Sequence, residues 1–515
     1  MTKLLVLSGF AAVLISAAPA AEDWPILTPK PGAAPHINGP AAYGARPAHP
    51  FLCRIRCTGQ RPIRFSVTNL PQGLTLEPTS GIIRGTTPSA AGDYRVTITA
   101  RNRHGKAVRE FRIVVGKTLS LTPQMGWNSW YTHYARVTDK TMREAADAMV
   151  ASGMADFGYE FVSVDDCWAR KADAPNPRHR GDARDPAGTI MPNLDFPDMK
   201  ALTDYIHAKG LKAGTYTSPG PLTCGGYTGS WQHEEQDAQT FADWGFDLLK
   251  YDLCSYRKTP GIQTAEDDQT PYRKMGAILQ SMPRDIVLNM CQYGRADVWK
   301  WGGDAGAQSW RTTGDLGLER DTALPGFYSI AFRNAGHWEY ARPGRWNDPD
   351  YILIGYVGDA HSWKEGRPAE RVKLTAHEQY SYMSLWALMA SPLFFGGDMA
   401  RLDDFTLNVL CNSEVIAINQ DLLGKQARIV RKTENEFILA KAVADNSLAV
   451  GLFNLGNEAR NIEVSWSDLG IQGRQEVRDL WRQKPAGTAS ATYGARVAPH
   501  GVMLVRLSGK KPARK

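Results

Sequence analysis

Three patterns of hydrophobic and polar residues follow one another along the chain. Between residues 51 and 118, apolar and polar residues alternate over short stretches that proline- and glycine-rich turns separate. In DYRVTITA, for example, Tyr94, Val96 and Ile98 lie on one face of a predicted strand. This pattern is typical of an Ig-like β-sandwich. The preceding residues 21–50, rich in Pro, Ala and Gly, are predicted to form a linker or lead-in.

Residues 119–425 show a second pattern, in which short apolar runs alternate with helical periodicity. Met142, Ala145, Ala146 and Met149 recur at the spacing of one helical face. Between such helices stand strand-like stretches, among them EFVSVDD, DLLKYD and PLFFGGD. Alternation of this kind over roughly 300 residues predicts a (β/α)8 TIM barrel.

The two ends of the chain carry different signals. Residues 426–508 contain strand patterns without helices, and we expect a C-terminal antiparallel β-domain. The basic tail 509–515, GKKPARK, is typical of a solvated end. Residues 1–20 contain Lys3, then an apolar run, and then a small-residue cleavage site. This order predicts a signal peptide and export to the periplasm or beyond. The fold class is therefore a multidomain protein built around a TIM barrel.

Composition narrows the classes of function. The chain has 515 residues and a net charge of +7, with its 60 basic and 53 acidic residues interspersed. No nucleic-acid motif stands out, and no segment after the signal peptide is apolar enough to span a membrane. Seven cysteines are compatible with disulfides in an exported protein. The oligomeric state stays open.

Charged residues gather at the ends of the predicted strands. In DWGFDLLKYDLC, Leu248, Lys250 and Asp252 share one strand face, and this segment alone fits a structural ion pair. Further charged residues stand at other predicted strand ends: Asp165, Asp166, Arg311, Asp315, Asp348, Asp350 and Asp398. Carboxylates often cap the helices that follow strands. Convergence of so many charges on one barrel mouth instead favours an active site, which lies at that end of TIM barrels.

The motifs of other chemistries are missing from the sequence. None of the 11 histidines ends a predicted strand, and no HExxH, GxSxG or P-loop motif is present, so we expect neither a metal nor a cofactor. Aspartates stand beside tryptophans such as Trp127 and Trp168. Carboxylates bind hydroxyls, aromatic faces stack on sugar rings, and a carboxyl pair can cleave a glycosidic bond. Sugar chemistry is therefore the predicted function.

The chain resembles glycoside hydrolase family 27, the α-galactosidase or melibiase family. The resemblance is carried by MGWNSW, VDDCW, DWGFDLLKYDLC, SWRTTGDL, WNDPDYILIG and EVIAINQDLLGKQ, in this order. The family implies a (β/α)8 barrel and a retaining double displacement that releases terminal α-galactose from oligosaccharides or polysaccharide side chains. The sandwich, in turn, resembles Ig-like modules joined to bacterial glycosidases, and its role stays open.

The resemblance implies a role for each matching residue. Asp252 would be the nucleophile and Asp315 the acid/base, with Lys250 also keeping Asp252 ionised. Cys224 and Cys254 would form a disulfide beside the pocket, and the pairing of the other cysteines stays open: Cys53, Cys57, Cys167, Cys291 and Cys411. The implied substrate-binding residues are Trp127, Asp165, Asp166, Tyr216, Lys250, Gln292, Arg311 and Asp350.

Three positions depart from the family pattern. Gln292 replaces a carboxylate and Tyr293 a tryptophan in the segment that contacts the 2-position of the sugar, so the 2-substituent preference is open. Tyr351 replaces an apolar residue, and we expect altered contacts at the pocket rim. The alternatives are a β-L-arabinopyranosidase or other α-glycosidase of the same family, or a non-catalytic galactose-binding protein. The presence of both carboxylates argues against the last of these.

Overall fold

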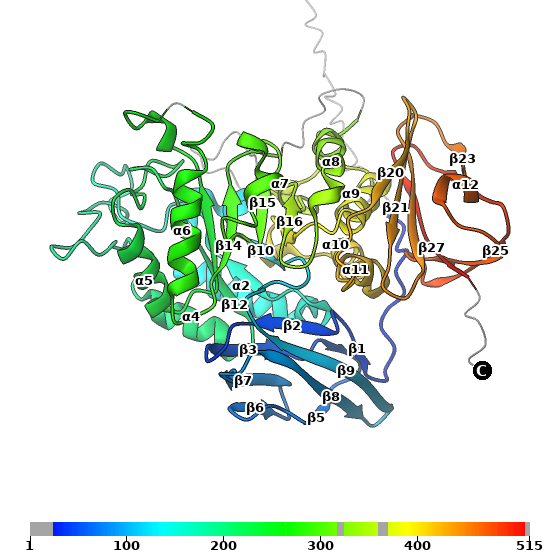
Figure 1. Ribbon diagram of the computed structural model, residues 1–515, viewed down its shortest axis with the longest axis horizontal. Helices are drawn as coiled ribbons and strands as arrows, with labels where there is room; N and C mark the ends of the chain where they lie inside the picture. Colours follow the sequence, from blue (N-terminus) through cyan, green and yellow to red (C-terminus); the bar gives the residue numbers. More distant parts are fainter. Residues whose placement is uncertain (1–23, 263, 317–323, 359–368, 510–515) are drawn as a thin grey trace, which may run out of the picture.

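The computed structural model describes residues 24–262, 264–316, 324–358 and 369–509. The predicted signal peptide, and all of the basic tail after Gly509, lie outside these residues. The described chain forms three parts: an N-terminal β-sandwich, a central α/β barrel and a C-terminal β-domain (Figure 1). This arrangement confirms the predicted fold class.

Eight parallel strands form the barrel sheet, in the order β16-β15-β14-β13-β12-β11-β10-β19. Beyond β16, Ile352 pairs in parallel with Phe395 of β19 and brings the two edges together. Most residues of these strands are buried because helices cover the sheet, as in other parallel sheets. The strand bounds are β10 (Met125–Asn128), β11 (Phe161–Ser163), β12 (Lys212–Thr217), β13 (Leu248–Asp252), β14 (Val287–Cys291), β15 (Ser309–Arg311), β16 (Trp346–Asp348) and β19 (Leu393–Phe395).

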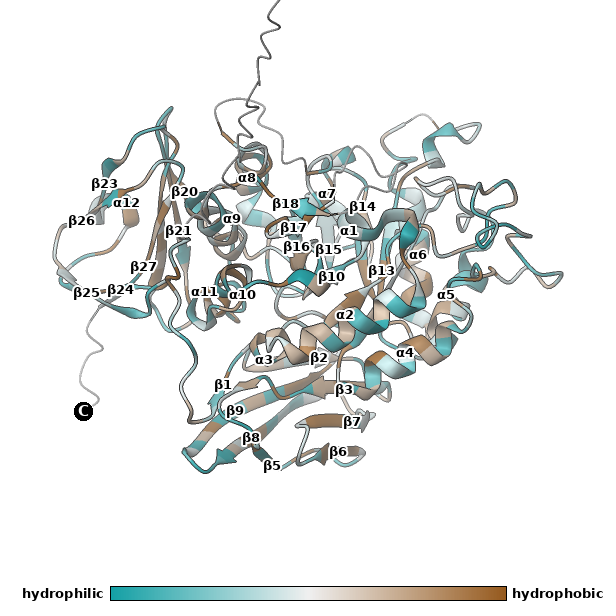
Figure 2. Ribbon diagram, turned by 180° about the vertical axis from the view of Figure 1, so that it is seen from behind, coloured by the Kyte–Doolittle hydropathy of each residue, from teal (hydrophilic) through white to brown (hydrophobic). Residues whose placement is uncertain are grey.

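The helices around the barrel are amphipathic, as their sequence patterns predict. In α2 (Asp139–Ala151) the four predicted face residues, from Met142 to Met149, are buried, and Thr138 caps the helix by accepting a hydrogen bond from Thr141 N at 3.2 Å. Figure 2 shows hydrophobic and hydrophilic residues together along α2 and α4. The other main helices are α4 (Met199–Ala208), α5 (Glu234–Trp244), α6 (Thr270–Ser281), α8 (Phe327–Ala335), α10 (Asp404–Leu410) and α11 (Ser413–Asn419).

Helix α9 (Ala376–Leu388) is buried on all sides from Glu378 onward, unlike α2. It lies between the barrel and the C-terminal domain, where it contacts β22 and β27. This explains why its sequence lacks a polar face. Among the described residues, no helix is both long enough and apolar enough to cross a bilayer.

The N-terminal sandwich consists of a four-stranded sheet, β2-β9-β8-β5, and a three-stranded sheet, β3-β7-β6. Strand β2 lies before residue 51, the predicted start of this module, and pairs in parallel with β9. Phe51, Phe65 and Phe111 belong to the core between the sheets. The bounds are β2 (Ala42–Ala45), β3 (Pro50–Arg54), β5 (Arg64–Thr68), β6 (Leu74–Glu77), β7 (Ile82–Thr86), β8 (Gly92–Asn102) and β9 (Gly105–Val115).

The C-terminal domain is antiparallel, as predicted. Its six-stranded sheet has the order β20-β21-β22-β27-β24-β25, and a second sheet pairs β23 with β26. Ile438, Val450, Ile462 and Val505 belong to the core of this domain. The bounds are β20 (Arg428–Lys432), β21 (Glu436–Ala442), β22 (Leu448–Asn454), β23 (Arg460–Ser465), β24 (Gln475–Asp479), β25 (Lys484–Ala489), β26 (Thr492–Val497) and β27 (Val502–Gly509).

Candidate active site

The parallel barrel brings the predicted site residues to one end of the sheet. Asp252 is the last residue of β13 and Arg311 the last of β15, while Asp165 and Asp166 follow β11 within three residues. In the register of the sheet, Lys250 lies between Tyr216 of β12 and Asn289 of β14. Because all strands run in parallel, these side chains face the carboxyl-terminal mouth of the barrel.

Two tyrosine hydroxyls hold the Asp252 carboxylate. The Tyr216 hydroxyl donates to Oδ2 at 3.1 Å and the Tyr293 hydroxyl donates to Oδ1 at 2.7 Å. Burial and, to a smaller extent, the nearby charge of Asp315 raise the pKa of Asp252 to about 6, although the charge of Lys250 opposes this shift. Within the described part of the chain, no cation forms an ion pair with Asp252, and its pKa lies above the usual range for a carboxyl group.

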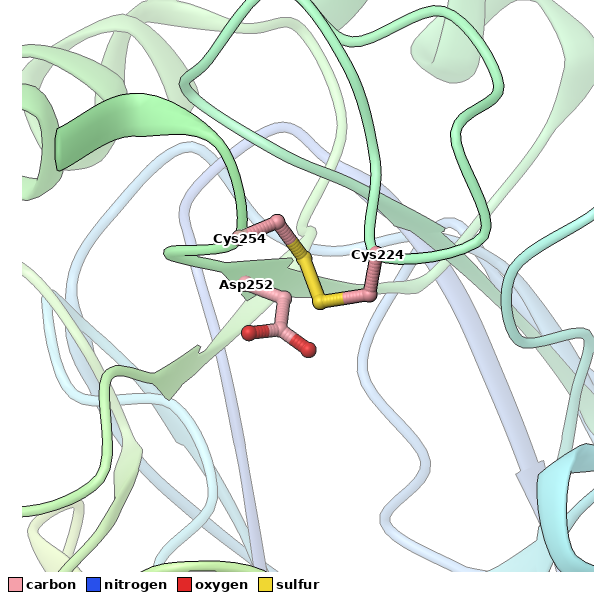
Figure 3. Close-up of side chains that lie close together, drawn as sticks. All are labelled: Cys224, Asp252 and Cys254. Atoms are coloured by element: carbon pink, nitrogen blue, oxygen red, sulfur yellow. A yellow bond between two sulfur atoms is a disulfide. The ribbon is translucent and has the colours of Figure 1, made fainter. Parts of the chain in front are cut away.

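A disulfide between Cys224 and Cys254 lies beside Asp252 (Figure 3), with Cα atoms 4.9 Å apart. This confirms the predicted bridge. The Tyr216 hydroxyl lies 3.1 Å from Cys254 Sγ, so the disulfide contacts a side chain that also holds Asp252. Among the described residues, these two cysteines and Asp252 form the single group of three potential metal ligands. The two sulfurs are bonded to each other and are not available as thiolates.

Lys250 forms its ion pair with Asp165, not with Asp252. Its Nζ lies 2.8 Å from Asp165 Oδ2. Burial is the largest single effect on the pKa of Lys250 and lowers it, but Asp165, Asp252 and other neighbouring groups together hold the pKa above the usual range. The charge of Lys250 lowers the pKa of Asp252, in the direction that the sequence predicts, but desolvation of Asp252 has the larger effect and raises its pKa.

Arg311 links two further carboxylates. Its Nη2 lies 3.0 Å from Asp350 Oδ2 and 3.2 Å from Asp315 Oδ1. Asp350 is 1% exposed and also accepts a hydrogen bond from Leu316 N at 2.9 Å. Burial raises the pKa of Asp350, although Arg311 opposes this shift. The Asp315 side chain is 68% exposed, in contrast to Asp252, which is 5% exposed.

The remaining predicted residues lie around this group. Asp166 accepts hydrogen bonds from Gly225 N and Cys167 N, both at 2.6 Å, and burial raises its pKa to about 6. Trp127 is fully buried, and its Nε1 donates to a backbone carbonyl at 2.8 Å. Gln292 is also fully buried, and among the described residues its Nε2 has no hydrogen-bond partner.

The backbone is left-handed at several non-glycine positions of this mouth. The φ angles are 77° at Cys167, 31° at Cys254, 66° at Tyr293 and 84° at Asp350. Each of these residues follows a barrel strand within four residues. Left-handed non-glycine residues are costly and concentrate at functional sites, where the surrounding structure fixes them.

The sequence prediction missed three residues that contact the carboxylates. Asn128 donates to Asp165 Oδ2 at 2.9 Å, and the Tyr131 hydroxyl donates to Asp350 Oδ2 at 3.1 Å. Tyr351 was expected at the rim, but it is buried and donates to Asp165 Oδ2 at 3.3 Å. Asn128 lies within the MGWNSW motif, and this motif is the sequence feature from which its place in the site could have been predicted. Asp398 instead caps a short helix by accepting from Ala400 N.

The fold and the site together define a barrel hydrolase with a buried and an exposed carboxylate at its mouth. A family model described as alpha-galactosidase A matches residues 122–421, a model of the alpha-galactosidase C-terminal β-sandwich matches residues 437–507, and an Ig-domain model matches residues 53–116. The chain belongs to the α-galactosidase (melibiase) family of glycoside hydrolases.

Individual relatives agree with this assignment. Alpha-galactosidase 2 of Arabidopsis thaliana is 36% identical over 78% of this chain and 93% of its own length. A candidate alpha-galactosidase/melibiase of Bacteroides fragilis has a structure that superimposes with a TM-score of 0.84 at 35% identity, covering 95% of this chain and 100% of its own. The structure of a β-L-arabinopyranosidase of Geobacillus stearothermophilus superimposes with a TM-score of 0.65 at 26% identity. The match covers 76% of this chain and 97% of that structure.

We predict that Tyr293→Phe shifts the pH dependence of hydrolysis. The Tyr293 hydroxyl bonds the charged carboxylate and thereby lowers the pKa of Asp252. Its loss should move the acidic limb of the kcat/KM profile upward by about one pH unit. The measurement is kcat/KM against pH on p-nitrophenyl α-galactoside. Tyr205→Phe, in helix α4, is the control and should leave the limb in place. If the acidic limb of the Tyr293→Phe profile stays at the native pH, the Tyr293 hydroxyl does not affect the pKa of Asp252.

We also predict that removing the disulfide lowers both stability and activity. Cys224 and Cys254 close a loop of 30 residues, which corresponds to about 3–4 kcal/mol in the free energy of unfolding. The double Cys→Ser variant should unfold at lower denaturant concentration and lose kcat/KM, because the segments beside Asp252 are no longer tied. Cys411→Ser, which removes an unpaired thiol, is the control. Equal effects in both variants would contradict the prediction.

Proposed function

We propose that the protein is an exported, retaining exo-α-galactosidase that acts by double displacement without a cofactor. The observation that carries this proposal is the pairing of unlike carboxylates at one mouth. Asp252 is buried, and both of its carboxylate oxygens accept hydrogen bonds from tyrosine hydroxyls. Asp315 is exposed, and its charge raises the pKa of Asp252. A retaining mechanism needs a nucleophile that meets the sugar and a second carboxyl group that meets the leaving group and water.

In the first step, an Asp252 oxygen bonds to the anomeric carbon while the glycosidic C–O bond breaks. Asp315 gives its proton to the departing oxygen, and the aglycone leaves. In the second step, Asp315 takes a proton from water as the water oxygen bonds to the anomeric carbon. The bond between the anomeric carbon and Asp252 breaks as the water oxygen attaches, and galactose leaves with its original α configuration.

The surrounding side chains suit the sugar-binding roles that the family resemblance implies. The Asp165–Lys250 pair and the Arg311–Asp350 pair present fixed acceptors and donors to hydroxyl groups. These charges are already paired within the protein, so they stay in place before a sugar enters. Such preorganisation favours orientation of the glycosidic bond over Asp252.

The alternative that deserves a test is a β-L-arabinopyranosidase, the activity named for the Geobacillus stearothermophilus relative. An arabinopyranose lacks the hydroxymethyl group of galactose. By resemblance, relatives that prefer it carry a longer acid at the position of Asp165, and this chain keeps the shorter one. Asp165 therefore favours the galactoside.

We predict that Asp252→Asn lowers kcat at least about 10³-fold while the protein stays folded, because an amide cannot serve as the nucleophile. Product release by the native enzyme, followed by NMR, should show α-galactose first. Asp93→Asn in the N-terminal sandwich is the control and should keep full activity. Near-normal turnover of Asp252→Asn would remove this residue from the mechanism, and first release of the β anomer would exclude retention.

The substrate assignment is tested by paired nitrophenyl glycosides. We expect kcat/KM on the α-D-galactopyranoside to exceed that on the β-L-arabinopyranoside by at least about tenfold, since one missing group in a fitted pocket is commonly worth 10–200-fold. A ratio in favour of the arabinopyranoside would make the alternative activity the correct one while leaving the roles of Asp252 and Asp315 intact.

A further inference from the structure

A cavity of about 470 Å³ lies between the N-terminal sandwich and the barrel, at the end opposite the active site. Its walls come from β2 and β3 of the sandwich and from the starts of barrel strands such as β11 and β12. In β12, Lys212 lines this cavity, whereas Tyr216 contacts Asp252 four residues later, about 13 Å along the strand. The cavity is therefore separate from the catalytic mouth.

Lys212 is a buried cation with no ion-pair partner among the residues that the structure describes. It is 8% exposed, and its Nζ lies 4.1 Å from the centroid of the Tyr43 ring and 5.8 Å from that of Phe161. Within the described part of the chain, Lys212 has no hydrogen bond from its ammonium group and no carboxylate within 4.0 Å. Two aromatic rings compensate a desolvated ammonium only in part.

The carboxylates that line the cavity are occupied by other cations. Glu160 pairs with Arg56 at 2.9 Å, and Asp247 pairs with Arg284 at 2.6 Å and with His207 at 2.7 Å. Asp285 and Asp204 are also paired, with Arg46 and Lys200 respectively. Lys212 thus faces the cavity as a donor for which the described residues supply no hydrogen-bond acceptor.

We propose that this cavity binds a small oxyanion, a phosphate or a carboxylate, through the Lys212 ammonium group. A volume of this size lies within the range of ligand pockets and accommodates such an anion with its water. The pKa of Lys212 supports this inference: burial lowers it to about 8, although Asp247 and Asp285 raise it and Arg284 lowers it further. An anion beside the ammonium would remove this penalty. Since walls from both parts form the site, binding should stabilise their docking.

The first test uses the native full-length protein. Inorganic phosphate and citrate are titrated by calorimetry and in thermal unfolding, against sodium chloride at matched ionic strength. We expect saturable binding and a saturable rise in Tm for at least one oxyanion and none for chloride. The two arms distinguish phosphate from carboxylate as the preferred ligand. No binding of either oxyanion would overturn the proposal.

The second test uses variants of Lys212. Lys212→Met should lower the oxyanion affinity at least about tenfold, as expected for the loss of about 1.4 kcal/mol, and Lys212→Arg should retain it. Lys209→Met, which removes a half-buried lysine that pairs with Asp147, is the matched control and should bind as the native protein does. α-Galactosidase activity should stay within about twofold in Lys212→Met, because this residue lies outside the catalytic machinery. Equal affinity in native protein and Lys212→Met would show that the anion binds elsewhere.

Discussion

Buried carboxylates at the barrel mouth constrain the rest of the structure, since a charged group removed from water is stable only when donors surround it. Asp165 meets this need with Lys250 and Asn128, and Asp350 meets it with Arg311 and a backbone amide. These partners come from different strands. The parallel sheet must therefore hold its register closely, because a shift of one residue would turn a lysine or an arginine away from the mouth.

Asp252 is the exception among these carboxylates, and the exception suits its proposed role. Its direct partners are neutral tyrosine hydroxyls, while the neighbouring cation, Lys250, is bonded to Asp165. A guanidinium or ammonium bonded to Asp252 would stabilise the charge that must be given up when a bond to carbon forms. Two neutral donors fix the position of the oxygens and leave the carboxylate with a pKa of about 6. The two tyrosines thus fix the position of the Asp252 oxygens, and the neighbouring lysine, held by Asp165, does not bond to the charge that must react.

Local pattern was enough to predict most of the charged residues at the mouth, but not which residues pair there. The period-two pattern of β13 places Lys250 and Asp252 on one face, and the barrel keeps them there. The partner of Lys250 lies after β11, two strands away, and its identity depends on how the sheet is assembled. The contact of Tyr293 depends on a left-handed backbone that no periodicity encodes. Strand β2, with four residues, became a strand only through its parallel pairing with β9.

Two lysines on neighbouring strands show how far partners, rather than burial, decide the state of a charge. Lys250 in β13 and Lys212 in β12 are each 8% exposed. At the active-site end, Asp165 and other neighbouring groups together raise the pKa of Lys250 despite its burial. At the opposite end, burial lowers the pKa of Lys212 to about 8, because the surrounding carboxylates are bonded to other cations. The same sheet therefore holds one lysine whose charge is satisfied within the protein and one whose charge is left for a ligand to satisfy.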